Sequence, residues 1–206
     1  MSGQIGAGVR VRLDAEARRS QILESARLVF AEKGYSQSGL SEIAARSAIS
    51  KTLIYHYFPG GRTELYSEVM SGLASALVES TRRATRAPVS VDQRVRALVE
   101  TFFDFFEREP DAFRLLILDP WGSGDLAILA QAMAVRVSIG SELGALLSGS
   151  GASYGQTVGA AAAVVGSLVF LCEAWMGGQM TKDDAVLVGA SFICAGLIGL
   201  ENPSLR

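Results

Sequence analysis

LSEIAARSAISKTLIYHYF, residues 40–58, is the stretch that decides how the rest of the chain is interpreted. In its first half Leu40, Ile43 and Ala44 recur at positions i, i+3 and i+4, which predicts a short helix with one apolar stripe. The polar turn Ser-Ala-Ile-Ser at 47–50 interrupts that pattern, and its last serine is a suitable N-cap for a following helix. The stretch therefore predicts two short helices joined by a tight turn.

The second predicted helix, residues 51–57, carries its apolar and polar side chains on different faces. Ile54 and Phe58 share one face. The other faces carry a cation, a hydroxyl and two polar rings, namely Lys51, Thr52, Tyr55 and His56. A short helix that exposes such groups suits the major groove of DNA.

With the helix that precedes them, these residues resemble the N-terminal signature of the TetR family, the tetracycline-repressor-like transcriptional regulators. That signature has a first helix of the form R-x-x-I-L-x-x-A-x-x-x-F, a Gly-aromatic pair, Ile-Ala, a small-small-aliphatic-Ser turn, then Lys, Tyr and an aromatic-Phe ending. The matching residues are Arg19, Ile22, Leu23, Ala26, Phe30, Gly34, Tyr35, Ile43, Ala44, Ser47, Ala48, Ile49, Ser50, Lys51, Tyr55, Tyr57 and Phe58. The resemblance covers residues 15–68 or so and is specific, because many positions agree at fixed spacing.

The match has three departures. Ala48 stands where the family usually has Gly, Thr52 stands where Gly is frequent, and the segment 58–62 is one residue longer than usual. The resemblance implies a helix-turn-helix DNA-binding domain over residues 14–66, with its motif at 39–58, and a helical regulatory and dimerisation domain over residues 67–206. Residues 1–13 are Gly-rich and lack periodicity, so we expect a disordered arm.

The resemblance also implies which side chains meet an operator in double-stranded DNA. We expect phosphate contacts from Lys51, Tyr55 and Tyr57, and base contacts from the middle of the second helix. The full candidate set is Ser38, Ser41, Ser50, Lys51, Thr52, Leu53, Tyr55, His56, Tyr57 and Arg62. The alternatives are a solvated surface lysine and core tyrosines with exposed hydroxyls.

The composition supports a helical protein with a mildly basic end. Hydrophobic residues make up 49% of the 206 residues and charged residues 19%, so a sizeable core is expected. Residues 1–66 hold nine Lys/Arg and six Asp/Glu, a net charge of +3, whereas residues 67–206 carry a net charge of −5. Helical periodicity without β-like alternation predicts an all-α fold of about nine helices: 14–33, 40–46, 51–57, 62–85, 90–108, 110–119, 125–147, 154–176 and 181–200.

The last two predicted helices are apolar on all sides. No charged residue occurs from Leu143 to Cys172 or from Ala185 to Leu200. Such helices are either buried or in a membrane. The first run is broken by Ser-Gly-Ser-Gly at 148–151 and the second has only 16 residues, so both fall short of a clean span of about 20 residues. We therefore assign them to a homodimer interface, as the resemblance also implies, with no membrane partner. The candidate interface residues are Gly159, Ala162, Gly166, Phe192 and Leu197.

Aromatic and soft side chains in the C-terminal part suit a pocket for a small apolar or amphipathic effector. The candidates are Phe102, Phe106, Phe113, Trp121, Met133, Tyr154, Phe170, Glu173 and Trp175. Ordinary core packing is the alternative for each aromatic residue. Glu173 is consistent either with a ligand contact or with a hydrated interface edge.

Enzymatic chemistry has no support in the sequence. The single histidine is His56, inside the predicted DNA-contacting helix, and no phosphate-binding loop follows a strand. Cys172 and Cys194 lack metal-ligand spacing and suit free thiols in a reducing cytoplasm, so no metal and no cofactor are predicted. We expect a cytoplasmic, homodimeric, ligand-released repressor that binds a palindromic operator. The alternatives are a membrane-associated helical protein and a small-molecule-binding enzyme.

Overall fold

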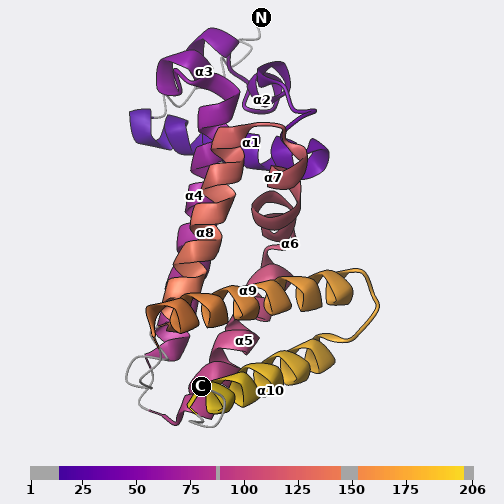
Figure 1. Ribbon diagram of the computed structural model, residues 1–206. Helices are drawn as coiled ribbons and strands as arrows, with labels where there is room; N and C mark the ends of the chain where they lie inside the picture. Colours follow the sequence, from indigo (N-terminus) through magenta and orange to yellow (C-terminus); the bar gives the residue numbers. More distant parts are fainter. Residues whose placement is uncertain (1–13, 87–88, 145–152, 202–206) are drawn as a thin grey trace, which may run out of the picture.

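The computed structural model of the chain describes residues 14–86, 89–144 and 153–201. All regular secondary structure in these ranges is helical, which confirms the predicted all-α class (Figure 1). The helices are α1 (Ala15–Lys33), α2 (Leu40–Arg46), α3 (Lys51–Tyr57), α4 (Gly61–Thr85), α5 (Val91–Arg108), α6 (Pro110–Phe113), the π-helical segment η1 (Arg114–Leu118), α7 (Asp119–Gly122), α8 (Leu126–Gly144), α9 (Tyr154–Met176) and α10 (Lys182–Glu201). The arm predicted over residues 1–13 lies outside the described residues.

The helices form a small unit at one end of an elongated molecule and a larger unit at the other. The first unit, called the head below, comprises α1, α2 and α3, and the second, called the body, comprises α5 to α10. Helices α4 and α8 pack side by side along the long axis, and α4 joins the head to the body. Helix α9 crosses α8, and α10 runs back beside it against α5 (Figure 1).

The segment from Pro110 to Gly122 differs from the prediction. A helix end was expected at Asp119-Pro120, but the chain stays helical through α6, η1 and α7. Pro120 lies in the first turn of α7, where its missing N–H removes little helical hydrogen bonding. The wide turn of η1 precedes it, and such π-helical turns are rare and concentrate at functional sites.

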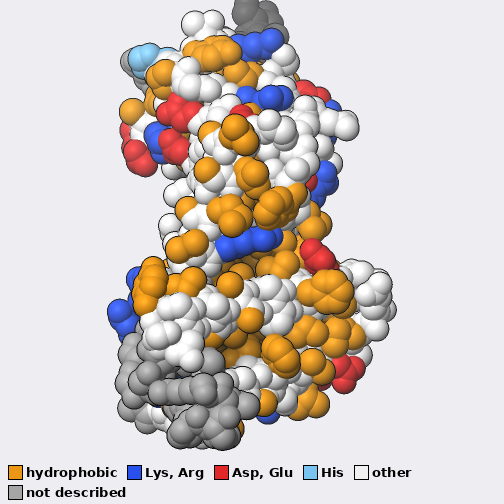
Figure 2. Space-filling view, viewed as in Figure 1, with side chains coloured by type: hydrophobic (Ala, Val, Ile, Leu, Met, Phe, Trp, Pro, Cys, Tyr) orange, Lys and Arg blue, Asp and Glu red, His pale blue; other side chains and the backbone are white. Residues whose placement is uncertain are grey.

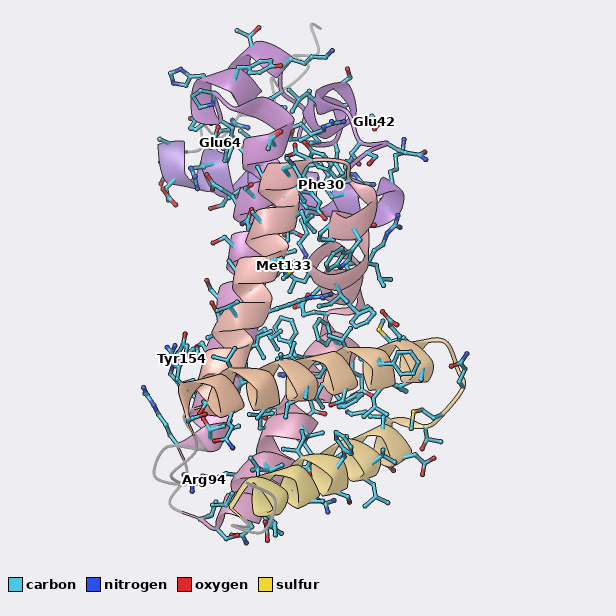
Figure 3. The ribbon with its side chains drawn as sticks, viewed as in Figure 1. Phe30, Glu42, Glu64, Arg94, Met133 and Tyr154 are labelled. Atoms are coloured by element: carbon cyan, nitrogen blue, oxygen red, sulfur yellow. The ribbon has the colours of Figure 1, made fainter. Side chains whose placement is uncertain are left out.

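Buried aromatic side chains connect the head with the body. Phe30 from α1 packs edge-on against Tyr66 from α4, with ring centroids 5.0 Å apart (Phe30 is labelled in Figure 3). The Tyr66 hydroxyl donates a hydrogen bond to the backbone carbonyl of Leu115 in η1, at 3.0 Å. Burial raises the pKa of Tyr66 well above its usual value, so this phenol remains a neutral donor.

The turn between α2 and α3 is held by short-range hydrogen bonds. The Ser47 hydroxyl donates to the carbonyl of Ile43 at 2.5 Å, and the Ser50 hydroxyl accepts from the backbone N–H of Leu53 at 3.1 Å. Between them Ala48 has a φ of 53°, which is the left-handed region that favours glycine. The alanine found where the resembling family usually has glycine is therefore a strained position.

Replacing Ala48 by glycine should stabilise the protein. The left-handed conformation costs an L-residue about 1–2 kcal/mol, and the extra chain entropy of glycine returns about 0.5–1 kcal/mol of this. We expect Ala48→Gly to raise the free energy of unfolding by about 0.5–1 kcal/mol in a denaturant titration. The control is Ala45→Gly, on the exposed side of α2, which should lower it by a similar amount. A loss of stability in Ala48→Gly would contradict this account of the turn.

Candidate nucleic-acid interface

Three buried apolar side chains anchor α2 and α3 within the head. Ile43, Ile54 and Phe58 are fully buried. The Arg19 guanidinium lies 4.8 Å from the centroid of the Phe58 ring and also pairs with Glu68 on α4. This anchoring leaves the opposite face of α3 at the tip of the molecule (Figure 1).

The outer face of α3 carries most of the predicted DNA contacts. Tyr55 is 51% exposed. Lys51, Thr52 and His56 are also exposed, whereas Leu53 and Tyr57 are half-buried and the His56 and Tyr57 rings meet edge-on at 5.4 Å. The structure thus places these polar groups together on one convex surface, with Ser41 and Ser50 exposed at the starts of α2 and α3.

The Tyr55 ring also limits the backbone that follows α3. Gly61 begins α4 with a φ of 62°, and a Cβ added there would lie 3.1 Å from the Tyr55 ring. A side chain at this position would therefore be strained by its backbone and would displace the ring.

Ser38 is a correction to the predicted interface. Its side chain is only 2% exposed, and its hydroxyl donates to the carbonyls of Gly34, at 2.6 Å, and Val29, at 3.3 Å. A buried, bonded hydroxyl is unavailable to DNA. Arg62 is held inward as well, because it donates to the Ser38 carbonyl at 3.2 Å and lies 4.4 Å above the Tyr35 ring. Both side chains stabilise the packing within the head.

Ion pairs neutralise much of the basic charge in the head. Lys33 pairs with Glu42, and Arg46 with Glu32 at 2.6 Å. Lys51 makes no ion pair with any residue that the structure describes, and it lies at the start of α3. This single uncompensated charge on the outer face makes Lys51 the strongest candidate for a phosphate contact.

Sequence reasoning missed a polar junction between the head and the body. Arg114 in η1 donates to the carbonyl of Ala31, near the C-terminal end of α1, at 2.9 Å, and binds Asp119 at 3.2 Å. Tyr35 donates to Asp125 at 3.0 Å, and this hydrogen bond lowers the pKa of the Asp125 carboxyl below its usual value. Partners 83 and 90 residues apart in the chain have no local sequence signal.

The nine predicted effector-binding residues do not line one pocket. Phe102, Phe106 and Phe113 are at most 2% exposed, and their rings pack edge-on at centroid distances of 5.0 and 5.2 Å. These three rings fill space against one another, and Phe113 also borders a surface hollow with Glu173 and Met176. Trp175 is half-buried against Phe103, with centroids 5.7 Å apart.

The remaining candidates lie toward the surface. Tyr154 is 86% exposed. It lies at the N-terminal end of α9, where Figure 3 labels it. Met133, Phe170 and Glu173 line a groove of about 490 Å³ between α8 and α9, a volume typical of small-molecule sites. Trp121 is 54% exposed beside it, and its ring centroid lies 4.9 Å from the Arg136 guanidinium carbon.

The outward faces of α9 and α10 carry many exposed apolar side chains, which appear in orange in the lower half of Figure 2. These side chains are Val158, Phe170, Met176, Leu187, Val188, Phe192 and Ile198, each more than 40% exposed. The predicted interface residues Gly159, Ala162, Gly166 and Phe192 are exposed there, and Leu197 is half-buried. By length and composition alone, α9 is also the one helix among the described residues that could cross a membrane.

Comparisons with known proteins agree with this geometry. Residues 22–69 match the family model described as "Bacterial regulatory proteins, tetR family". The chain is 40% identical over 105 residues to the HTH-type transcriptional activator FasR of Mycolicibacterium smegmatis, covering 51% of this chain and 48% of that protein. It is 25% identical over 109 residues to the HTH-type transcriptional repressor NicS of Pseudomonas putida, covering 53% and 50%. The chain thus spans about half the length of these curated relatives.

Solved structures share the fold. A TetR-like transcriptional regulator from Rhodococcus sp. RHA1 superposes with a TM-score of 0.74 at 24% identity, covering 91% of this chain and all of that one. The regulator FadR from Bacillus subtilis, in complex with stearoyl-CoA, superposes with a TM-score of 0.72 at 17% identity, covering 87% and 98%. The likeness therefore extends through the body as well as the head.

Proposed function

We propose, from the premise that this chain belongs to the TetR family of bacterial regulatory proteins, that it is a homodimeric repressor released from a palindromic operator by a small apolar or amphipathic ligand. The observation that carries the proposal is the outer face of α3, where Lys51, Thr52, Tyr55 and His56 are exposed together at the tip of the head. Activation is the second candidate, since the relative with 40% identity is named an activator.

In this proposal α3 enters the major groove of DNA. Lys51 and Tyr55 bind phosphates and fix the position of the helix. Thr52, Leu53 and His56 then reach base edges, where a hydroxyl or ring nitrogen bonds to a base and an apolar side chain meets a thymine methyl group. Because Ser38 and Arg62 are bound within the head, we leave them out of the interface.

Dimerisation through α9 and α10 brings the head of a second copy of the chain to the other half of the operator. The exposed apolar side chains on these helices suit a partner with the same surface, as in a two-fold symmetric dimer. A membrane-spanning α9 would show the same exposure, because only 22% of its most apolar 18-residue segment is buried within the chain. The family relatives are transcriptional regulators, which favours the dimer and a cytoplasmic location over a membrane or an enzymatic role.

Polar contacts at the head-body junction couple ligand binding in the body to the position of the head. Arg114 in η1 bonds to the last turn of α1, and Tyr66 on α4 bonds to η1 as well. A ligand that displaces η1 therefore moves α1 and changes the separation of the two heads. Ligand and operator must then weaken one another's binding by the same factor, typically about 5- to 150-fold.

Two substitutions on α3 test the DNA interface. We expect Lys51→Ala and Tyr55→Phe each to weaken binding of the operator duplex by about 1–3 kcal/mol, because each loses a direct contact. Lys51→Ala should also reduce the salt dependence of binding by about one phosphate contact. The control is Arg108→Ala, an exposed basic residue on α5 in the body, which should bind as the wild type does. Unchanged affinity in both head variants, with folding intact, would remove these residues from the interface.

A further inference from the structure

The groove between α8 and α9 has the shape of a site for an elongated ligand. Its wall on α8 includes Met133, Val137 and Gly140, which recur at positions of one helix face. Its wall on α9 runs from Val158 to Glu173, a rise of about 22 Å along the helix. Figure 2 shows mainly hydrophobic side chains along this part of the surface, with a basic side chain among them.

Small residues lie where α8 and α9 cross, and open space remains beside the crossing. A Cβ added to Gly140 would lie 3.3 Å from the Cβ of Ala161, so α8 and α9 approach closely at this point. A Cβ added to Gly166 would meet no heavy atom within 4 Å, so the groove has free space there. The open part therefore extends along α9 beyond the crossing.

One basic side chain on the lining, Arg136, is half-buried and makes no ion pair with any residue that the structure describes. The Nε of Arg136 is buried and has no hydrogen-bond partner among the residues that the structure describes. Stacking on the Trp121 ring, at 4.9 Å, holds the guanidinium in place. The Arg136 side chain lines the groove, so an anionic ligand group there would form a charge-assisted hydrogen bond with the guanidinium.

We infer that the groove binds a single-tailed anionic amphiphile, with its carboxylate on Arg136 and its hydrocarbon tail along α9. This inference rests on the proposed function, because it names the chemical class of the effector. Glu173 is the single acidic residue on the lining, and it is exposed. Water screens the exposed Glu173 more strongly than the half-buried Arg136, so Arg136 sets the preferred sign of the ligand.

The test compares three probes that share a ten-carbon chain and differ in head group, each kept below its solubility limit or micelle-forming concentration. Decanoate, decanol and decyltrimethylammonium are titrated into the full chain by calorimetry, without DNA. We expect decanoate to bind about 10- to 100-fold more tightly than decanol, as for a hydrogen bond to a charged group. Octanoate should bind about fourfold more weakly per methylene removed.

Two variants separate recognition of the head group from burial of the tail. Arg136→Gln should remove the preference for decanoate while leaving decanol affinity unchanged. Met133→Ala, on the α8 wall of the groove and outside the proposed dimer face, should remove apolar contact and weaken both probes together. The matched control is Arg83→Gln, an exposed arginine on α4 that pairs with Glu79, which should leave all affinities unchanged. Sedimentation of each variant checks that assembly is intact.

Other outcomes overturn the inference. Equal binding of decanoate and decanol, or an unchanged decanoate affinity in Arg136→Gln, would show that Arg136 does not anchor the ligand. Tighter binding of the ammonium probe would assign the groove to a cation held by Glu173. No saturable binding would mean that a second copy of the chain or another partner covers the groove. Because DNA is absent, each of these results leaves the DNA-binding proposal standing.

Discussion

Ala162→Glu should convert the dimer into a monomer and abolish operator binding. Ala162 is exposed on α9, among the apolar side chains that we assign to the interface. At a two-fold axis each substitution places a carboxylate near its own symmetry copy. An unpaired buried charge costs about 3–5 kcal/mol, which weakens dimerisation by roughly a hundredfold to several thousandfold.

Two further variants define this experiment. Phe192→Glu tests the same face from α10, where Phe192 is 60% exposed. Phe192 does not line the α8–α9 groove, whereas Ala162 does, so a loss of the dimer in both variants points to the dimer face and not to the groove. Ala130→Glu is the control, because Ala130 is exposed on α8, outside the α9–α10 face. Sedimentation velocity measures the assembly, and a duplex-binding titration measures the loss of the second head. A stable dimer in both glutamate variants would place the interface elsewhere.

Phe106→Ala should destabilise the body severely. Phe106 is fully buried, and its ring packs edge-on against those of Phe102, Phe105 and Phe113 at centroid distances of 5.0 to 5.3 Å. Truncating such a side chain leaves a cavity and costs about 3–5 kcal/mol. For a chain of this length the melting temperature should fall by roughly 6–20 °C.

The same experiment distinguishes packed aromatics from exposed ones. Trp121→Ala is the control, because the Trp121 ring is 54% exposed and should contribute less than about 1 kcal/mol to stability. The Trp121 variant should instead weaken decanoate binding, since its ring supports Arg136. A loss below about 1 kcal/mol in Phe106→Ala would mean that the aromatic cluster is loosely packed, and would restore it as a candidate effector cavity.

The helices themselves were predictable because their ends carry local signals. Helix α9 begins at Tyr154 and ends at Met176, as predicted, since Ser153 caps it by accepting from the N–H of Gln156. Helix α1 likewise starts after Asp14, whose side chain accepts from the Ala17 N–H at 2.7 Å. Both signals lie within three residues of the helix end, so the sequence alone contains them.

The polar head-body junction and the burial of Ser38 were not predictable in the same way. Ser38 occurs in a polar loop that resembles an exposed segment, but its hydroxyl turns inward to two backbone carbonyls. The contact between Arg114 and Ala31 depends on how η1 packs against α1, and placing Arg114 within the predicted helix over 110–119 did not reveal that packing. Such pairings arise from tertiary packing, which residue spacing does not encode.

The effector-binding candidates show a second limit. An aromatic side chain on an apolar helix face has the same sequence signal whether it fills the core, as Phe102 does, or lies beside open space, as Phe170 does. Arg136 was missed, because an arginine in a helix usually indicates a solvated surface. Its significance comes from a buried Nε and a stacked indole ring, and both require coordinates.

Footprinting on the DNA that flanks this protein's own coding sequence tests the central claim most directly. We predict two protected half-sites related by a two-fold axis. Their centres should lie about one DNA turn apart, roughly 34–36 Å, or at another spacing that the operator matches. The protection should be lost in Lys51→Ala at moderate salt and retained in Arg108→Ala. A single unsymmetrical site, or protection that persists when Lys51 and Tyr55 are both replaced, would contradict the assignment of α3 as the DNA-reading helix of a symmetric dimer.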